Sequence, residues 1–294
     1  YSPRMPWLYL TLFSAFSLAT ADAVTKRYLS HYPAGELVLV RFGVTAILLL
    51  PLLLMQPWPA MPAPFWGWVA ALLPFEILAM WLYMKAIRQS PLTLTLPYLA
   101  FTPVFNTVTG YVLLGETVTM QGFSGIALVV CGAWLLNIDA MNNGSQRDVL
   151  APFRAIASEP GSRLMLAVAA LYSLTSVMGK GALQYVPAGF FGPFYFVLLG
   201  VIASIVFARR EARPWQVLAR HPWAHLGVGL FMGLMVLTHF LAIQHVEVAY
   251  MIAVKRTSLL FGMLYGAWLF REGGLGKNLV AGVIMLAGVY LIAG

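Results

Sequence analysis

Residues 26–35 read KRYLSHYPAG, and residues 180–189 read KGALQYVPAG. Both stretches contain a lysine followed seven residues later by Pro-Ala-Gly, and they lie 154 residues apart. Further matches, such as Glu116 with Glu272, recur at an offset of 156 residues. Two nearly equal offsets indicate that the chain consists of two related halves, the second with a two-residue insertion.

The composition is that of a membrane protein with many helical spans. Of the 294 residues, 61% are hydrophobic and 10% are charged, whereas a soluble domain carries about 25% charged residues. Ten apolar stretches each have the ~20 residues that a helix needs to cross about 30 Å of hydrocarbon. They lie at residues 7–28, 36–55, 65–84, 92–114, 120–138, 163–184, 189–208, 222–245, 249–270 and 276–293.

One long polar segment near the midpoint divides the chain. We predict an N-terminal five-helix repeat at 1–140, a cytoplasmic linker at 141–162 and a C-terminal five-helix repeat at 163–294. Because five is odd, the second half must enter the membrane in the opposite orientation. The predicted fold is an all-α membrane protein with ten transmembrane helices in two inverted five-helix repeats. This design is typical of transporters that work by alternating access, although duplicated halves can also form a rigid pore.

The basic residues outside the spans lie almost entirely on one side of the membrane. One side carries only Arg4, whereas the other carries twelve lysines and arginines. The positive-inside rule then places the central linker in the cytoplasm and both termini outside. We expect a multi-pass protein of the bacterial inner (plasma) membrane. Cytoplasmic loops account for the net charge of +8, so no nucleic-acid partner is expected.

Charged residues inside the spans are the first candidates for function, because a charge at the bilayer centre costs roughly 2.5–3.5 kcal/mol. Five cations lie inside spans or near their edges: Lys26, Arg41, Lys180, Lys255 and Arg256. Only two acids, Asp22 and Glu76, are clearly embedded with them. The surplus of about three positive charges predicts a wet central cavity suited to an anion.

Lys255 and Arg256 are the predicted ligands of that anion. An arginine grips phosphate or carboxylate with a planar fork, and a lysine adds a point charge. Adjacent residues of a helix point about 100° apart. The two side chains could therefore hold one anionic group from two sides, or one of them could pair with Glu76. The alternative is that both belong to a structural ion network.

Lys26 and Lys180 occupy equivalent places in the two halves. Either they act as gates or contribute positive charge to the cavity, or their side chains extend to the membrane interface. Asp22 lies one turn before Lys26 and could partly neutralise it.

Three further embedded groups are expected to tune the charge of the site. Glu76 either orients a cation or carries a proton as the coupling ion. His239 in the eighth span is a second titratable group that could face the cargo. Arg41 is expected to pair with Glu36 or Glu76.

Pro97 and Pro103 interrupt the fourth span. Such breaks are tolerated where they line a cavity, and the nearby Tyr98 and Asn106 could donate hydrogen bonds to a ligand. A kink that serves only helix packing is the alternative.

No metal, other cofactor or enzymatic site is predicted. His221 and His225 have the i,i+4 spacing of metal ligands, but they flank a span edge and no third ligand is evident. The sequence contains neither a phosphate-binding Gly-Lys-Ser/Thr loop nor a convergent set of catalytic residues. We therefore expect neither an ATP-driven pump nor an enzyme.

With these features the chain resembles the EamA-type members of the drug/metabolite transporter superfamily. The resemblance is carried by two five-span halves and by Gly115-Glu116 at the end of the fourth span, before a glycine-rich fifth span. In the second half, Arg271-Glu272 replaces Gly-Glu. The resemblance implies a central cavity lined by spans one to four and six to nine, with spans five and ten at the periphery.

A narrower similarity is to the sugar-phosphate and nucleotide-sugar translocators. In that branch a Lys-Arg pair of the ninth span binds the cargo phosphate, and Lys255-Arg256 match this pair. The resemblance therefore implies an anion-binding role for the same two residues.

The sequence predicts a secondary active transporter that moves a small organic anion, phosphorylated or carboxylated, by alternating access. One alternative is an exporter of amino acids, drugs or other neutral or zwitterionic metabolites, in which the embedded cations pair internally. Another is a flippase for an anionic lipid headgroup, which would need a cavity that opens sideways to lipid.

Overall fold

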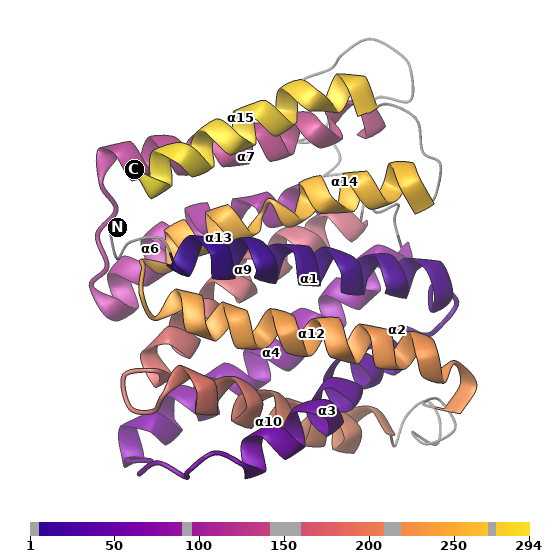
Figure 1. Ribbon diagram of the computed structural model, residues 1–294, viewed down its shortest axis with the longest axis vertical. Helices are drawn as coiled ribbons and strands as arrows, with labels where there is room; N and C mark the ends of the chain where they lie inside the picture. The colour runs from indigo at the N-terminus through magenta and orange to yellow at the C-terminus, as the bar shows by residue number, and fades with distance from the viewer. Residues whose placement is uncertain (1–5, 90–95, 142–159, 209–218, 270–274) are drawn as a thin grey trace.

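The apolar stretches form helices, because a backbone in hydrocarbon must satisfy its hydrogen bonds within its own segment. The computed structural model describes residues 6–89, 96–141, 160–208, 219–269 and 275–294, and no strand is present in these ranges. Most of the helices run across the molecule side by side (Figure 1).

The first half contains five membrane spans, two of which are built from more than one helical element. Its elements are α1 (Pro6–Tyr28), α2 (Ala34–Leu39), η1 (Val40–Val44), α3 (Thr45–Leu54), α4 (Ala63–Gln89), η2 (Leu96–Phe101), α6 (Thr102–Leu114) and α7 (Met120–Met141). The second span comprises α2, a π-helical turn η1, and α3. The fourth span begins with the 3₁₀ segment η2 and continues as α6.

The second half repeats this order. Its elements are α9 (Pro160–Ala182), α10 (Ala188–Ala208), α12 (Pro222–Ile243), α13 (Val248–Lys255), α14 (Ser258–Leu269) and α15 (Leu275–Ala293). The ninth span is divided into α13 and α14. Most of the predicted linker lies outside the described residues, so the division at 141–162 stays a prediction.

The number of spans agrees with the sequence. Within the described residues, seven helices are long and apolar enough to cross a membrane. Three shorter apolar helices, Tyr98–Leu114, Met120–Leu135 and Val280–Ala293, correspond to spans four, five and ten. The prediction of an all-α membrane protein with ten transmembrane helices in two five-helix repeats is confirmed.

Packing between the halves follows the repeat. α1 packs along α12, and its repeat equivalent α9 packs along α4. In the same way, α14 packs against α1 and α6 packs against α9, while α3 and α10 pack against each other. Helix starts keep the offsets of the sequence: Ala34 and Ala188 are 154 residues apart, and Thr102 and Ser258 are 156 apart. The two halves therefore interlock through equivalent helices.

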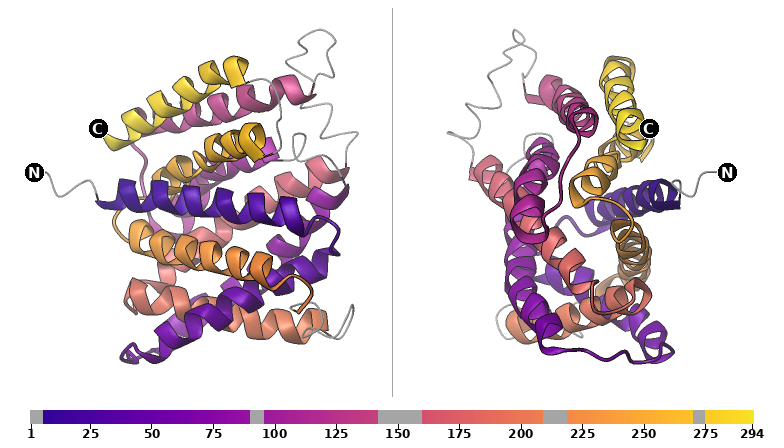
Figure 2. Two further views of the ribbon diagram at one scale, coloured as in Figure 1. Left: turned by 45° about the vertical axis from the view of Figure 1, so that its right-hand side comes forward. Right: turned by 90° about the vertical axis from the view of Figure 1, so that its left-hand side faces the viewer.

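Helices α7 and α15 form a pair at one edge of the molecule (Figures 1 and 2). Their backbones approach closely, because a Cβ atom placed on Gly288 would lie 2.6 Å from the carbonyl oxygen of Gly125. Glycine is thus required at this crossing, as is common for membrane helices. The peripheral position of spans five and ten agrees with the expectation from the family resemblance.

Candidate substrate site

Charged and aromatic side chains from seven helical elements meet in the interior of the bundle. This central polar cluster consists of Asp22 (α1), Arg41 (η1), Glu76 and Tyr83 (α4), Tyr172 (α9), Tyr195 (α10), His239 (α12), Lys255 (α13) and Arg256. Both repeats contribute to it, so the cluster lies at the interface between the halves.

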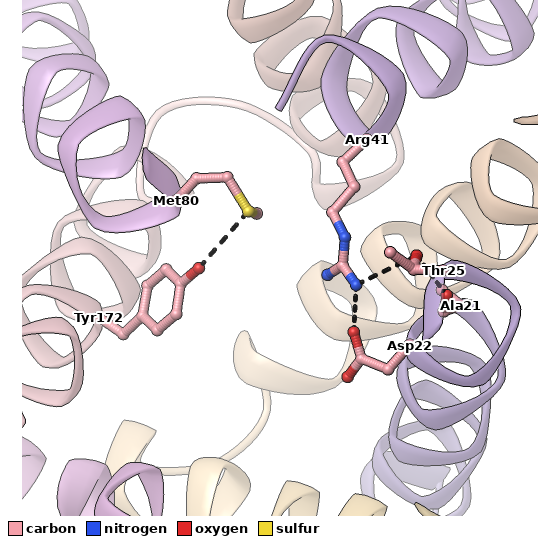
Figure 3. Close-up of polar contacts among 6 residues, drawn as sticks. All are labelled: Ala21, Asp22, Thr25, Arg41, Met80 and Tyr172. Atoms are coloured by element: carbon pink, nitrogen blue, oxygen red, sulfur yellow. Dashed lines mark hydrogen bonds and ion pairs between the residues drawn. The ribbon is translucent and has the colours of Figure 1, made fainter. Parts of the chain in front are cut away.

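Arg41 forms an ion pair with Asp22 (Figure 3). Its Nη2 atom donates to Asp22 Oδ1 and, at 3.4 Å, to Thr25 Oγ1. The guanidinium also lies 5.8 Å from the centre of the Tyr83 ring. Arg41 sits in the π-helical turn η1, and such turns are frequent at functional residues.

The partner of Arg41 differs from the sequence expectation of Glu36 or Glu76. Glu36 instead approaches Arg220, with its Oε2 atom 3.6 Å from Arg220 Nη1. Asp22 of α1 forms the ion pair with the buried guanidinium instead. The pairing depends on how the helices are placed, which spacing along the chain does not contain.

Lys255 lies beside His239, with Nζ 3.1 Å from Nδ1. The same Nζ is 3.2 Å from Met235 Sδ. A charged lysine can only donate hydrogen bonds, so the His239 ring accepts through Nδ1 whenever Lys255 carries its proton. The charges of Lys255 and Glu76 interact across the cluster, although no ion pair within 4.0 Å joins them. The structure thus brings together three of the predicted residues.

Arg256 has no acidic partner within the part of the chain that the structure describes. Its side chain is 8% exposed, and its buried Nε atom makes no hydrogen bond. The guanidinium is close enough to Tyr83 and Tyr172 for electrostatic interaction with both. The neighbouring Thr257 also has a buried hydroxyl without a hydrogen-bond partner. Arg256 is therefore a buried cation whose Nε donor is unsatisfied within the described residues.

Residues 256–257 interrupt the ninth span, which the sequence predicts as one continuous helix. Here Thr257 N bonds to Val254 O at 3.0 Å, and Leu259 N bonds to Arg256 O at 2.9 Å. These i→i−3 bonds form a tighter turn between α13 and α14. Broken helices of this kind are used at the binding sites of membrane carriers.

Lys180 lies at the end of α9 and pairs with Glu116, its Nζ atom 2.5 Å from Oε1. It also donates to the carbonyl of Val246 at 2.7 Å, in the turn before α13. Lys255 is the last residue of α13, seven residues after its first residue Val248, which is about 10 Å of helix. Lys180 therefore belongs to a separate group at one end of the bundle.

Three other predicted residues lie in different surroundings. Lys26 is partly exposed near the end of α1, one turn beyond Asp22. Tyr98 is fully buried and packs edge-on against Trp134 of α7, with ring centroids 5.9 Å apart. Asn106 of α6 accepts a hydrogen bond from Ser176 Oγ at 3.1 Å, while its buried Nδ2 atom has no partner.

Sequence reasoning missed the tyrosines of the cluster. Tyr83 contacts Arg41, and electrostatic interactions link Tyr172 with Arg41 and Arg256. Tyr195 lies near Glu76, as does the hydroxyl of Thr175. The available signal was the position of Tyr172 in the middle of its span, since tyrosines that anchor a helix at the interface lie near span ends.

His221 and His225, the two histidines with the spacing of metal ligands, lie at the start of α12 and contact His31 and Tyr32. The His221 ring lies 5.8 Å from that of His31 and 6.2 Å from that of Tyr32, while His225 contacts Tyr32 at 5.7 Å. Within the described ranges, no group of three or more His, Cys, Asp or Glu side chains could hold a metal ion.

Comparison with known proteins identifies the family. The sequence model of the EamA-like transporter family matches residues 5–138 and, separately, residues 160–294. An uncharacterized transporter of Methanothermobacter thermautotrophicus is 27% identical over 195 residues, covering 64% of this chain and 53% of that protein. The chain thus spans about half the length of this curated relative.

A solved crystal structure shares the fold. It aligns with 97% of this chain and 98% of its own, with a TM-score of 0.73 and 14% sequence identity. Because the family match covers both halves of the chain, this multi-pass membrane protein belongs to the EamA-like transporter family.

Proposed function

We propose that the protein is a secondary active transporter that moves a small organic anion, phosphorylated or carboxylated, by alternating access. The observation that carries the proposal is the buried guanidinium of Arg256, which has no acidic partner within the described residues. An uncompensated buried charge costs several kcal/mol. A carboxylate or phosphate of the cargo would remove this cost and occupy the planar fork.

The position of the cluster supports transport rather than static binding. Lys255 and Arg256 come from the second repeat, whereas Asp22, Arg41 and Glu76 come from the first. Rocking one repeat against the other would therefore open the site to each side of the membrane in turn. In this proposal Lys255 lies beside the anion, and Glu76 balances the lysine charge.

The proposal is tested by uptake of labelled probes into proteoliposomes. The probes are glycerol 3-phosphate, lactate, succinate and serine, chosen after ligand-stabilisation screening of the purified protein. Arg256→Gln is expected to lower uptake of the accepted anion by at least about tenfold, because the fork is lost. Arg163→Gln serves as the matched control, because Arg163 is exposed at the start of α9. Wild-type uptake by the Arg256 variant would refute the proposal.

A second candidate is a carrier of zwitterions such as amino acids. It is favoured by the pairing of Arg41 with Asp22, which places an acid as well as cations in the cluster. Such a carrier would hold the cargo carboxylate on Arg256 and its ammonium group near Asp22 or Glu76. Stabilisation by serine, but not by lactate or glycerol 3-phosphate, would favour this candidate over the first.

The coupling ion and the orientation belong to the same proposal. If Glu76 carries the coupling proton, Glu76→Gln will abolish the response of uptake to an imposed pH gradient. If it only balances Lys255, uptake will fall equally with and without the gradient. We place the protein in the bacterial inner membrane with both termini outside and the central linker, residues 141–162, in the cytoplasm, since twelve basic residues lie on the linker side against one on the other. Labelling of single cysteines from each side checks the orientation.

A further inference from the structure

We infer that the site accepts cargo with a single negative charge at Arg256, and that Asp22 sets this limit by neutralising Arg41. The inference rests on the proposed function as an anion transporter and narrows its substrate class. It selects monoanions such as monocarboxylates over phosphate dianions and dicarboxylates.

The first step is the charge balance of the folded cluster. Counting along the chain predicted a surplus of about three embedded cations. In the structure Arg41 pairs with Asp22 and Lys180 pairs with Glu116, while Lys255 interacts electrostatically with the opposite charge of Glu76 without forming an ion pair.

Among the described residues of the central polar cluster, one cation is then left without an acid. That residue is Arg256, buried and with its Nε atom free of hydrogen bonds. His239 adds no charge while it accepts from Lys255 through Nδ1. A monoanion would therefore neutralise the cluster, whereas a dianion would leave one negative charge buried without compensation, which is costly.

The second step concerns the place of Arg41. Its guanidinium lies 5.8 Å from the centre of the Tyr83 ring, and Tyr83 also interacts electrostatically with Arg256. Tyr172 likewise interacts with both arginines. The two guanidiniums thus share the same two tyrosines as neighbours. If Asp22 lost its charge, Arg41 would become a second cation without an acidic partner in the central polar cluster.

The third step supplies a matched control. Glu116 neutralises Lys180 in the same manner, but this pair lies at the far end of α13, about 12 Å of helix from Arg256. Removing the charge of Glu116 also frees a lysine, yet it does so outside the central polar cluster. The accepted cargo charge should therefore respond to Asp22 and not to Glu116.

The experiment compares succinate with monomethyl succinate, which differ by one carboxylate masked as an ester. Binding is measured by thermal stabilisation of the purified protein during titration. The wild type is expected to bind monomethyl succinate more tightly. Asp22→Asn should shift the affinity ratio toward succinate by at least about tenfold, because it adds one uncompensated cation. Glu116→Gln should leave the ratio unchanged.

A double variant guards against a misfolded or rearranged single variant. Asp22→Asn combined with Arg41→Gln removes both members of the pair, so it should restore the preference for monomethyl succinate. A wild type that prefers succinate, or an unchanged ratio in folded Asp22→Asn, overturns the inference while anion transport stands. No binding of either acid by the wild type also overturns the inference, because the site then does not select monocarboxylates. Binding of either acid that survives Arg256→Gln overturns the proposed function as well.

Discussion

The carboxylate of Glu116 binds both Lys180 and the first turn of α13. Its Oε1 atom lies 2.5 Å from Lys180 Nζ, while Oε2 accepts a hydrogen bond from Val248 N at 2.9 Å. The carboxylate thus satisfies a free amide at a helix N-terminus and also neutralises a cation of α9. It follows Gly115, whose φ of 68° ends α6 in the left-handed conformation that glycine adopts readily. One side chain therefore joins α6, α9 and α13.

We expect Glu116→Gln to lower stability, because the amide keeps only part of this arrangement. Loss of the ion pair and weakening of the helix cap should cost about 1–2 kcal/mol. This corresponds to a decrease in Tm of about 2–6 °C, measured by thermal unfolding of the purified protein. Glu247→Gln is the control, because Glu247 is the N-cap residue of α13 but makes no side-chain cap hydrogen bond. Equal melting temperatures for the two variants would contradict the role of Glu116.

The geometry of Arg256 predicts that charge alone is not sufficient for binding. Arg256→Lys keeps the positive charge but loses the planar fork, so anion affinity should fall by about tenfold. Arg256→Gln should fall further. Titration of both variants with the anion that stabilises the wild type provides the measurement. Wild-type affinity in the lysine variant would mean that the site recognises charge without bidentate geometry.

His239 is expected to act as a hydrogen-bond acceptor for Lys255. Glutamine can provide an acceptor in place of Nδ1, so His239→Gln should retain uptake within about threefold of the wild type. His239→Leu leaves Lys255 with only Met235 Sδ as a hydrogen-bond partner among the described residues, so uptake should fall by about tenfold. Uptake of both variants is measured across a range of pH. If both variants lose uptake to the same extent and the remaining uptake no longer depends on pH, then transport requires protonation and deprotonation of the His239 ring rather than its acceptor role.

The close crossing of α7 and α15 predicts a steric penalty at Gly288. An added Cβ would meet the Gly125 carbonyl oxygen at 2.6 Å, so Gly288→Ala should destabilise by about 1–3 kcal/mol. Gly262→Ala in α14 is the control, because nothing lies within 4 Å of its Cβ position. Thermal unfolding measures both. Because the pair is peripheral, the folded Gly288 variant should still bind the anion, and selective loss of binding would contradict the assignment of the site.

Much of the fold could be predicted from the sequence, because the signals for it are local. Apolar stretches of about twenty residues specify spans, and the lysine followed by Pro-Ala-Gly in each half specifies the repeat. The stretch that carries Lys255 and Arg256 was correctly assigned to the ninth span. Its interruption after Lys255 was not predicted, because apolar content does not distinguish one helix from two that follow each other.

The candidate site was harder to predict, since ion pairing depends on contacts between helices. The embedded charges of Arg41 and Asp22 were recognised, but no spacing along the chain shows that they face each other. Glu116 is recognisable from the sequence only as part of the repeat and of the family resemblance, because its partners Lys180 and Val248 lie 64 and 132 residues away along the chain. Because the structure pairs several of the embedded cations with acids, the surplus of positive charge is smaller than the sequence predicts.

The matching interruptions of spans four and nine show where the two halves have diverged. Thr102 and Ser258 begin equivalent helices, yet the positions equivalent to Lys255 and Arg256 in the first half are Leu99 and Ala100. The two halves thus have nearly the same helix arrangement, but only the C-terminal half carries two cations at this position. Under the proposed function, the charged end of a cargo would stay anchored to the C-terminal half whichever face is open. The equivalent segment of the N-terminal half, which carries Leu99 and Ala100, would then move past the bound molecule as that half rocks.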